Sequence, residues 1–104
     1  MDEIAALTVT CVSEGTDVVL VVAGELDMDT VDELREAIAS APGGTAGSRI
    51  FDLAAVEFID SSGLAALLAS RNGSEAVKVR RPSPSVERLI LATGLTGVIE
   101  VVEP

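Results

Sequence analysis

The sequence contains no histidine, one cysteine and only two aromatic residues, Phe51 and Phe58, among its 104 residues. Without histidine, the usual base for a serine nucleophile is missing, and a metal site of His and Cys ligands is excluded. One cysteine cannot form an intrachain disulfide, which argues against a disulfide-stapled secreted domain. With so few aromatic side chains, the core must be built from Val, Leu, Ile and Ala.

Positive charge is also scarce, with 7 Lys and Arg against 17 Asp and Glu, a net charge of −10 and a pI near 4.1. Nucleic acids and anionic membrane surfaces both require a basic face, so neither is an expected partner. The acidity keeps the domain soluble, or it steers a basic protein partner toward it. Composition leaves both interpretations open.

Long hydrophobic runs are absent as well. The longest, such as Val18 to Ala23, is far too short to span a bilayer. The N-terminus lacks the basic region and apolar stretch of a signal peptide. We therefore expect a cytoplasmic protein without membrane insertion, folded as one domain over residues 1–104.

The first strands are predicted as a hairpin. Leu7 to Ser13 alternates between apolar and polar residues, as in a half-buried strand, and places Cys11 in the inward phase as a small core residue. Glu14 to Asp17 is a turn signal, and Val18 to Ala23 is typical of a buried strand. A polar loop over Gly24 to Asp29 follows.

Three helices and three short strands are predicted after this loop. The first helix begins at Thr30, which forms a capping box with Glu33, and stops at Pro42-Gly43-Gly44. The other helices have their own start and stop signals: Asp60 or Ser61 with Asn72-Gly73, and Ser83-Pro84 with Gly94. The remaining strands are predicted at Arg49 to Leu53, Ala76 to Val79 and Val98 to Val102.

Alternation of strands and helices after a hairpin predicts an α/β fold: a mixed sheet with parallel crossovers, flanked by helices. Ligand and partner surfaces of such sheets lie at the carboxyl ends of the strands. Two loops meet that description, Gly24 to Asp29 and Phe58 to Gly63. We expect these two loops to be adjacent in space.

The segment Asp60-Ser61-Ser62-Gly63 is the strongest candidate for function. Asp and Ser are preferred helix caps, so capping alone is one interpretation. Two hydroxyls and a glycine exceed what a cap requires, and Gly63 in a first helical turn suggests close approach of another backbone. A serine here is also well placed to carry a phosphate, because a helix N-terminus favours an anion.

The sequence gives less support to catalysis, nucleotide binding or cation binding. The Gly-x-Ser-x-Gly nucleophile elbow is absent, and Gly43-Gly44 lacks the Lys and Ser/Thr of a phosphate loop. This argues against a nucleotide-hydrolysing enzyme and against a cofactor of the chain's own. Asp27 and Asp29 are interpreted as solvated loop carboxylates rather than a weak cation site. Arg80-Arg81 is interpreted as a solvated pair, although it could pair with phosphate.

Asp52 to Leu64 resembles the central motif of the STAS domain family, and more narrowly that of bacterial anti-sigma factor antagonists. Gly24-Glu25-Leu26-Asp27 is similar to the family's loop after the second strand. Pro82 to Val86 and Thr93 to Leu95 are similar to its third-helix region. The resemblance covers nearly the whole chain and implies a mixed sheet flanked by helices.

The resemblance also implies a function, which is regulation of transcription by partner switching. The partner is an anti-sigma factor with a histidine-kinase-like ATPase fold, which is also a serine kinase. The unphosphorylated antagonist binds it and frees a sigma factor. Phosphorylation at Ser61 ends the binding, and a phosphatase resets the switch. The implied partner-binding residues are Glu25, Leu26, Asp27, Asp60, Ser62, Gly63 and Leu64.

A second function within the same family stays open. Gly63-Leu64-Ala65 followed by Leu67-Leu68 is similar to STAS subunits of phospholipid transport complexes. In that case the chain would be an unphosphorylated accessory subunit that docks on an ABC-type transporter. Neither function makes the chain an enzyme.

Overall fold

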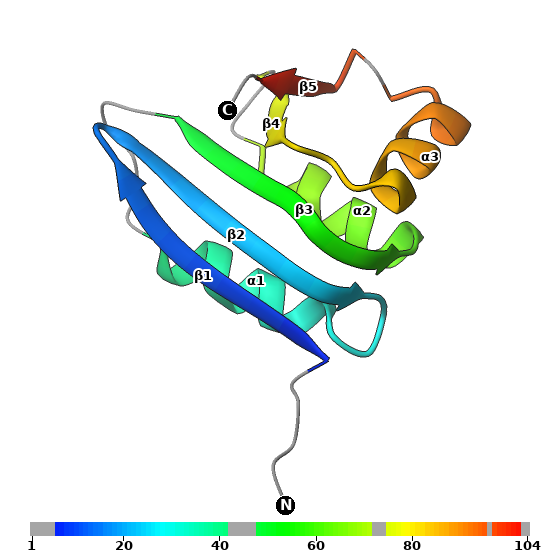
Figure 1. The fold of residues 1–104 in the computed structure, drawn as a ribbon, viewed down its shortest axis with the longest axis horizontal. Helices are drawn as coiled ribbons and strands as arrows, with labels where there is room; N and C mark the ends of the chain where they lie inside the picture. The colour runs from blue at the N-terminus through cyan, green and yellow to red at the C-terminus, as the bar shows by residue number, and fades with distance from the viewer. Residues whose placement is uncertain (1–5, 42–47, 72–74, 96, 103–104) are drawn as a thin grey trace, which may run out of the picture.

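The computed structural model describes residues 6–41, 48–71, 75–95 and 97–102, in which strands and helices alternate after an N-terminal hairpin (Figure 1). The elements in chain order are β1 (Leu7–Glu14), β2 (Asp17–Leu26), α1 (Val31–Ser40), β3 (Arg49–Ile59), α2 (Ser61–Ala69), β4 (Val77–Arg80), α3 (Pro84–Thr93) and β5 (Ile99–Val102). The predicted order of strands and helices is confirmed. No helix in these ranges is long and apolar enough to cross a membrane.

The five strands form one mixed sheet in the order β1-β2-β3-β4-β5. β1 and β2 are antiparallel and pair from Leu7 opposite Gly24 to Glu14 opposite Asp17. Gly15, with φ of +63°, makes the tight turn between them. The other neighbouring strands are parallel, as the predicted crossovers require. The predicted α/β class is therefore confirmed.

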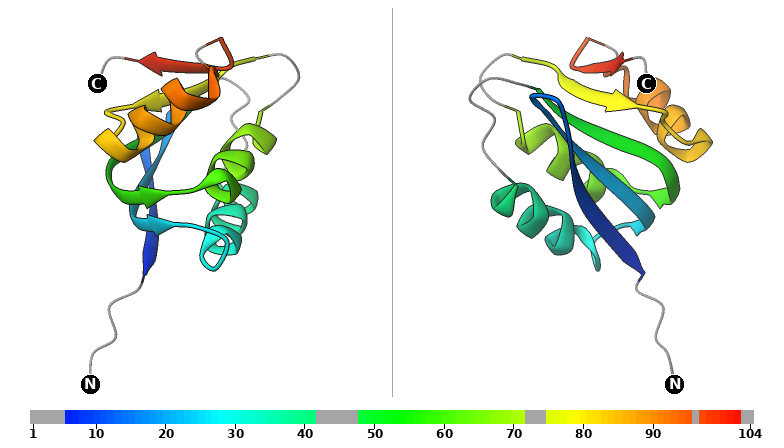
Figure 2. Two further views of the ribbon diagram at one scale, coloured as in Figure 1. Left: turned by 90° about the vertical axis from the view of Figure 1, so that its right-hand side faces the viewer. Right: turned by 60° about the vertical axis from the view of Figure 1, so that its left-hand side comes forward.

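The helices cover the sheet in two places. Helices α1 and α2 lie side by side on one face (Figure 2). Helix α3 packs against the carboxyl half of β3, where β4 no longer pairs with that strand. The Ser83 amide donates to the Leu53 carbonyl (3.2 Å), and the Ser85 hydroxyl donates to the Glu57 carbonyl (3.0 Å). The segment entering α3 therefore occupies the edge of β3 that would otherwise be unpaired.

The core is aliphatic, as the composition predicts. Phe51 is buried within it, whereas the other aromatic residue, Phe58, is exposed. The other fully buried side chains of the same core cluster are aliphatic: Leu20, Leu26, Leu34, Leu53, Leu67, Val22, Val56, Val79 and Val86. Each fully buried aliphatic side chain stabilises the fold by about 1.5–3 kcal/mol before the entropy of ordering is subtracted.

Two strands are longer than predicted. β2 continues to Leu26 and β3 to Ile59, whereas the sequence predicted their ends near Ala23 and Leu53. These strands pair with each other along almost their whole lengths, with register shifts after Val21 and Gly24. Pairing between segments that are distant in sequence thus extends both strands through residues whose local sequence predicts a loop.

Gly24 makes one of these irregularities possible. Its φ is +109°, and a Cβ atom there would lie 2.2 Å from the Ala6 carbonyl oxygen. Only glycine fits both the backbone conformation and the space. The next residue, Glu25, donates its amide to the same Ala6 oxygen at 2.8 Å.

The predicted helix ends are partly correct. The Ser83 hydroxyl caps α3 by accepting from the Val86 amide, Pro84 opens the helix, and Gly94 ends it with φ of +70°. The predicted capping box at Thr30 is wrong, because its hydroxyl donates to the Glu25 carbonyl at 2.7 Å instead. The stop signals at 42–44 and 72–73 lie outside the described residues.

The prediction that Cys11 lies in the core is wrong. Leu7 is buried and Val9 is half-buried, but Cys11 and Ser13 on the same side of β1 are exposed. Since β1 is an edge strand, the covered part of its inner face ends near Val9. Alternation gives the direction of a side chain but not the extent of the layer that covers it.

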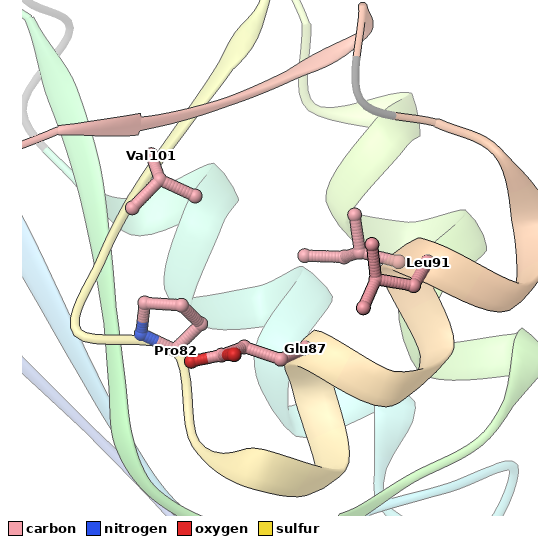
Figure 3. A pocket seen from close by; sticks show the side chains of 5 residues that line it. Pro82, Glu87, Leu91 and Val101 are labelled. Atoms are coloured by element: carbon pink, nitrogen blue, oxygen red, sulfur yellow. The ribbon is translucent and has the colours of Figure 1, made fainter.

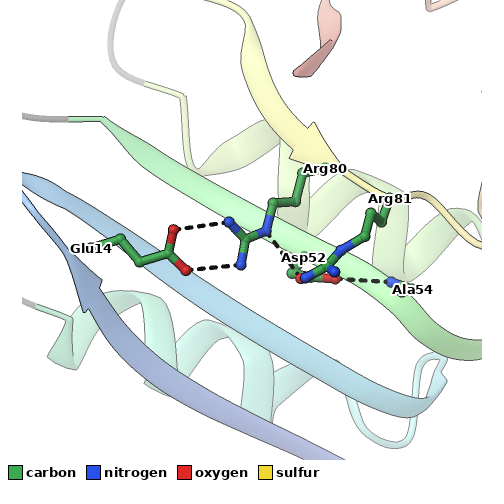
Figure 4. Close-up of polar contacts among 5 residues, drawn as sticks. All are labelled: Glu14, Asp52, Ala54, Arg80 and Arg81. Atoms are coloured by element: carbon green, nitrogen blue, oxygen red, sulfur yellow. Dashed lines mark hydrogen bonds and ion pairs between the residues drawn. The ribbon is translucent and has the colours of Figure 1, made fainter. Parts of the chain in front are cut away.

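Arg80 and Arg81 are engaged in a network across the open side of the sheet (Figure 4). The Asp52 carboxylate, only 5% exposed, accepts from Arg80 Nε at 3.0 Å and from Arg81. The other two guanidinium nitrogens of Arg80 donate to the two Glu14 carboxylate oxygens, both at 3.0 Å. The interpretation of these arginines as a solvated pair is therefore wrong.

This network predicts an acid-dependent loss of stability. Burial raises the pKa of Asp52, but hydrogen bonds from Arg81, the Ala54 amide and Arg80 outweigh it and hold the pKa below its usual value. Stabilisation by Asp52 is therefore fully present above its unfolded pKa of about 3.9 and is lost as the pH falls through the lower folded value. Urea unfolding at a series of pH values should show this decrease.

The Asp52→Asn variant is the control for that experiment. It should be less stable near neutral pH, because two arginines lose an ionic partner, and its stability should fall less between about pH 5 and pH 2. An acid dependence as steep as that of the unmodified chain would show that Asp52 is not responsible.

Candidate functional site

The carboxyl ends of β2 and β3 lie next to each other, as the sequence predicts. Glu25 is opposite Phe58, and Leu26 is opposite Ile59. One hydrogen bond extends this pairing beyond the strands, from the Asp60 amide to the Leu26 carbonyl (3.2 Å). The two predicted loops therefore form one rim at this edge of the sheet, from which α1 and α2 begin (Figure 1).

Asp60 is the N-cap of α2. Its Oδ1 accepts from the amides of Ser62 at 2.9 Å and Gly63 at 3.1 Å, and its backbone is extended. Two amides that the helix leaves unpaired are thereby satisfied. The capping interpretation thus holds for Asp60, and its carboxylate is already used within the helix.

Replacing this cap should destabilise the domain moderately. Asp60→Ala leaves two amides without a partner, so we expect a loss of about 1 kcal/mol in the free energy of unfolding. Asp60→Asn retains an oxygen acceptor and should lose much less. Urea unfolding of both variants checks this, and equal losses would show that the carboxylate charge, not the cap, matters.

Gly63 lies against the end of β2. A Cβ atom at this position would be 2.6 Å from Leu26 Cγ and 2.9 Å from the Leu26 carbonyl oxygen. Neither separation is tolerated by real side chains, and the second involves backbone that cannot simply rotate away. The predicted close approach of another backbone to Gly63 is confirmed.

The two serines of this segment differ in their surroundings. Ser61 is exposed at the first position of α2, and Ser62 is half-buried. The Ser61 hydroxyl makes no hydrogen bond within the part of the chain that the structure describes. Of the two hydroxyls, that of Ser61 is the more open to a second molecule.

Three predicted partner-binding residues are buried. Leu26 is fully buried, Leu64 is 5% exposed, and Gly63 is buried within the first turn of α2. Leu26 and Leu64 therefore pack in the hydrophobic core, and Gly63 lies against the end of β2.

The two acidic residues of the first loop have different roles. Glu25 is exposed on β2. Asp27 is half-buried, and its Oδ1 accepts from the amides of Asp29 at 3.0 Å and Thr30 at 3.1 Å. Asp27 therefore organises the turn before α1, which corrects its interpretation as a solvated carboxylate. No cluster of three or more potential metal ligands occurs in the described ranges.

Two exposed apolar side chains at this rim were not among the predicted site residues. Met28 is 73% exposed in the loop before α1, and Phe58 is 49% exposed on β3 opposite Glu25. Solvent-exposed apolar groups beside polar ones are typical of protein contact surfaces. The position of Met28 between Asp27 and Asp29, in a segment expected to be a polar loop, was the available signal. The exposure of Phe58 depends on the pairing of β3 with β2.

Comparison with known proteins gives a consistent result. The profile of a family described as "Mlab, STAS domain" matches residues 9–103. An anti-sigma F factor antagonist of Lysinibacillus sphaericus is 35% identical over 83 residues, which cover 75% of this chain and 71% of that protein.

Solved structures show the same relationship. A crystal structure of an anti-sigma factor antagonist from Mycobacterium paratuberculosis superposes with a TM-score of 0.75 and 32% identity, over 91% of this chain and 84% of the other. The anti-sigma factor antagonist SpoIIAA in its unphosphorylated form has a TM-score of 0.64 and 24% identity, over 91% and 88% of the two chains. The second likeness concerns the fold alone.

Proposed function

The chain belongs to the STAS domain family, and from this premise we propose that it is an anti-sigma factor antagonist switched by phosphorylation of Ser61. Unmodified, it binds an anti-sigma factor and frees a sigma factor; phosphorylated, it dissociates. The observation that carries the proposal is the exposed Ser61 hydroxyl, held at a fixed rim by the Asp60 cap and the Gly63 contact. The chain acts by binding, not by catalysis.

The charge of the rim explains how phosphate would act on binding. A phosphate on Ser61 adds about −1.5 to −2 charges next to Asp60, on the rim that also carries Glu25 and Asp27. A helix N-terminus tolerates this charge. Because Asp60 already accepts from the Ser62 and Gly63 amides, phosphate gains few new bonds inside the domain. Its main effect therefore falls on a partner fitted to a neutral hydroxyl.

The partner surface lies on the rim around Ser61. The exposed Glu25, Met28 and Phe58 and the half-buried Ser62 supply its polar and apolar contacts. The surface is held in shape by Asp60, Asp27, Leu26, Gly63 and Leu64. Such a rim fits a partner face with basic and apolar side chains. The partner also delivers the phosphate in this proposal, so it is a serine kinase. Its histidine-kinase-like ATPase fold is what the resemblance to anti-sigma factor antagonists implies. ATP belongs to that partner, and a phosphatase reverses the modification.

Phosphorylation can be tested with purified components. The chain is incubated with its cognate anti-sigma factor and ATP, and the intact mass is measured. We expect the addition of one phosphate to the unmodified chain and to Ser62→Ala, and none to Ser61→Ala. No addition to the unmodified chain, or equal addition to Ser61→Ala, would exclude Ser61 as the acceptor.

A second candidate function is favoured by the description of the matching family, which names Mlab. In that case the same rim docks on the ATPase of an ABC-type phospholipid transporter, and Ser61 contributes as a neutral hydroxyl. A pull-down with the tagged chain distinguishes the two, since it retains either an anti-sigma factor or a transporter ATPase.

A further inference from the structure

A shallow hollow of about 380 Å³ lies between α3 and β5 (Figure 3). Its lining comprises Pro82, Glu87, Ile90, Leu91 and Val101. Leu91 is 71% exposed and Val101 is 59% exposed, which makes them two of the most exposed large apolar side chains in the described ranges. Pro82 and the buried Ile90 complete an apolar wall.

The fold does not require these two side chains to be apolar. Val86 and Ile90 are the buried face of α3, and Leu91 lies about 100° around the helix from Ile90. Val101 shares a face of β5 with the buried Ile99, but it is exposed. Neither side chain contributes much to the core, so their apolar character is better explained by contact with another molecule.

One charged side chain limits what that molecule can be. Glu87 precedes Leu91 by one turn of α3, and it is the only charged residue in the lining. A carboxylate beside aliphatic side chains complements an aliphatic group that is accompanied by a cation. The net charge of −10 favours the approach of a basic segment in the same way.

We propose that this hollow is a second docking surface, for a segment of another protein that carries aliphatic side chains and a Lys or Arg. The aliphatic groups lie between Leu91 and Val101, and the cation faces Glu87. The surface is formed by the β4–α3 connection, α3 and β5, whereas the proposed switch is formed by β2, β3 and α2. The two surfaces share no residue, so a short peptide at the hollow does not have to contact Ser61.

Peptide titration followed by two-dimensional NMR tests the proposal on the full chain. The probes are acetyl-Leu-Val-Lys-Leu-amide and its Glu-for-Lys counterpart. We expect the Lys peptide to shift the amide signals of Glu87, Leu91 and Val101 and to leave that of Ser61 unchanged. Glu87→Gln should weaken binding by about two- to fivefold, the effect of one exposed ion pair. Leu91→Ser should abolish it.

The matched control is Val12→Ser, which removes an exposed aliphatic side chain from β1 and should leave peptide binding unchanged. Equal binding of the Glu peptide would overturn the proposal, as would shifts elsewhere or no shifts at millimolar peptide. Sedimentation measures whether the chain self-associates. Self-association that Leu91→Ser abolishes would also contradict the proposal, because a second copy of the chain would then occupy the hollow.

Discussion

Gly63→Val is expected to lower the free energy of unfolding by about 3 kcal/mol, the upper part of the range for overpacked sites. The first added carbon would already lie 2.6 Å from Leu26 Cγ and 2.9 Å from the Leu26 carbonyl oxygen. The Leu26 side chain is fully buried, and its carbonyl is held by the Asp60 amide, so neither can move freely. Helix propensity is the one contribution that favours the variant, because valine is a better helix former than glycine.

Urea unfolding measures this loss, and Ala65→Val is its matched control. Ala65 is exposed on the same helix two residues later, so the added methyl groups meet no packed neighbour. The control should lose only the helix propensity of a β-branched residue, about 0.5 kcal/mol. A Gly63→Val loss no larger than that of the control would show that α2 does not pack tightly on the end of β2.

The local signals in the sequence predicted much of the fold. Ser83, Pro84 and Gly94 are read correctly as the ends of α3, because caps and glycine stops depend on neighbouring backbone only. Asp60 is read correctly as the start of α2 for the same reason. The alternation of strands and helices then left few topologies to choose from.

Features that depend on the assembled sheet rather than on the local residue pattern were missed. The Thr30 hydroxyl binds the Glu25 carbonyl rather than its own helix, and Cys11 lies beyond the covered part of β1. Asp52 is buried in the sheet because arginines 28 and 29 residues away neutralise it. Local sequence does not report such partners, which only the assembled sheet brings together.

In the candidate site, too, some features follow from local residue types and others depend on how the chain packs. Asp60, Ser61 and Gly63 are identified from residue types alone, since capping, hydroxyl chemistry and close packing each require particular side chains. Leu26 and Leu64 were assigned to the partner surface but are buried. Met28 and Phe58 were left out although they are exposed. Motif position predicts which residues form the site, but only the packing of the folded chain separates the buried ones from the exposed ones.

The second large effect is expected at Ser61. Ser61→Asp places a permanent carboxylate at the exposed first position of α2, on the rim that also carries the exposed Glu25. Like charges or a desolvated carboxylate at an interface cost several kcal/mol, so binding to the anti-sigma factor should weaken by about a hundredfold. The domain itself should keep its melting temperature, because an acidic residue in the first turn of a helix is favourable.

Ala92→Asp is the control for this effect, since it adds the same charge at an exposed position on α3, outside the proposed rim. It should bind the anti-sigma factor as the unmodified chain does. A comparable loss in this control would mean that overall charge, not the position of Ser61, governs the association.

Titration calorimetry of the chain against its cognate anti-sigma factor, together with the melting temperature of each variant, tests the central claim most directly. The proposed switch predicts tight binding of the unmodified chain and of Ala92→Asp, and binding about a hundredfold weaker for Ser61→Asp at an unchanged melting temperature. Unaltered binding of Ser61→Asp, or a loss of binding that accompanies a loss of folding, would contradict it.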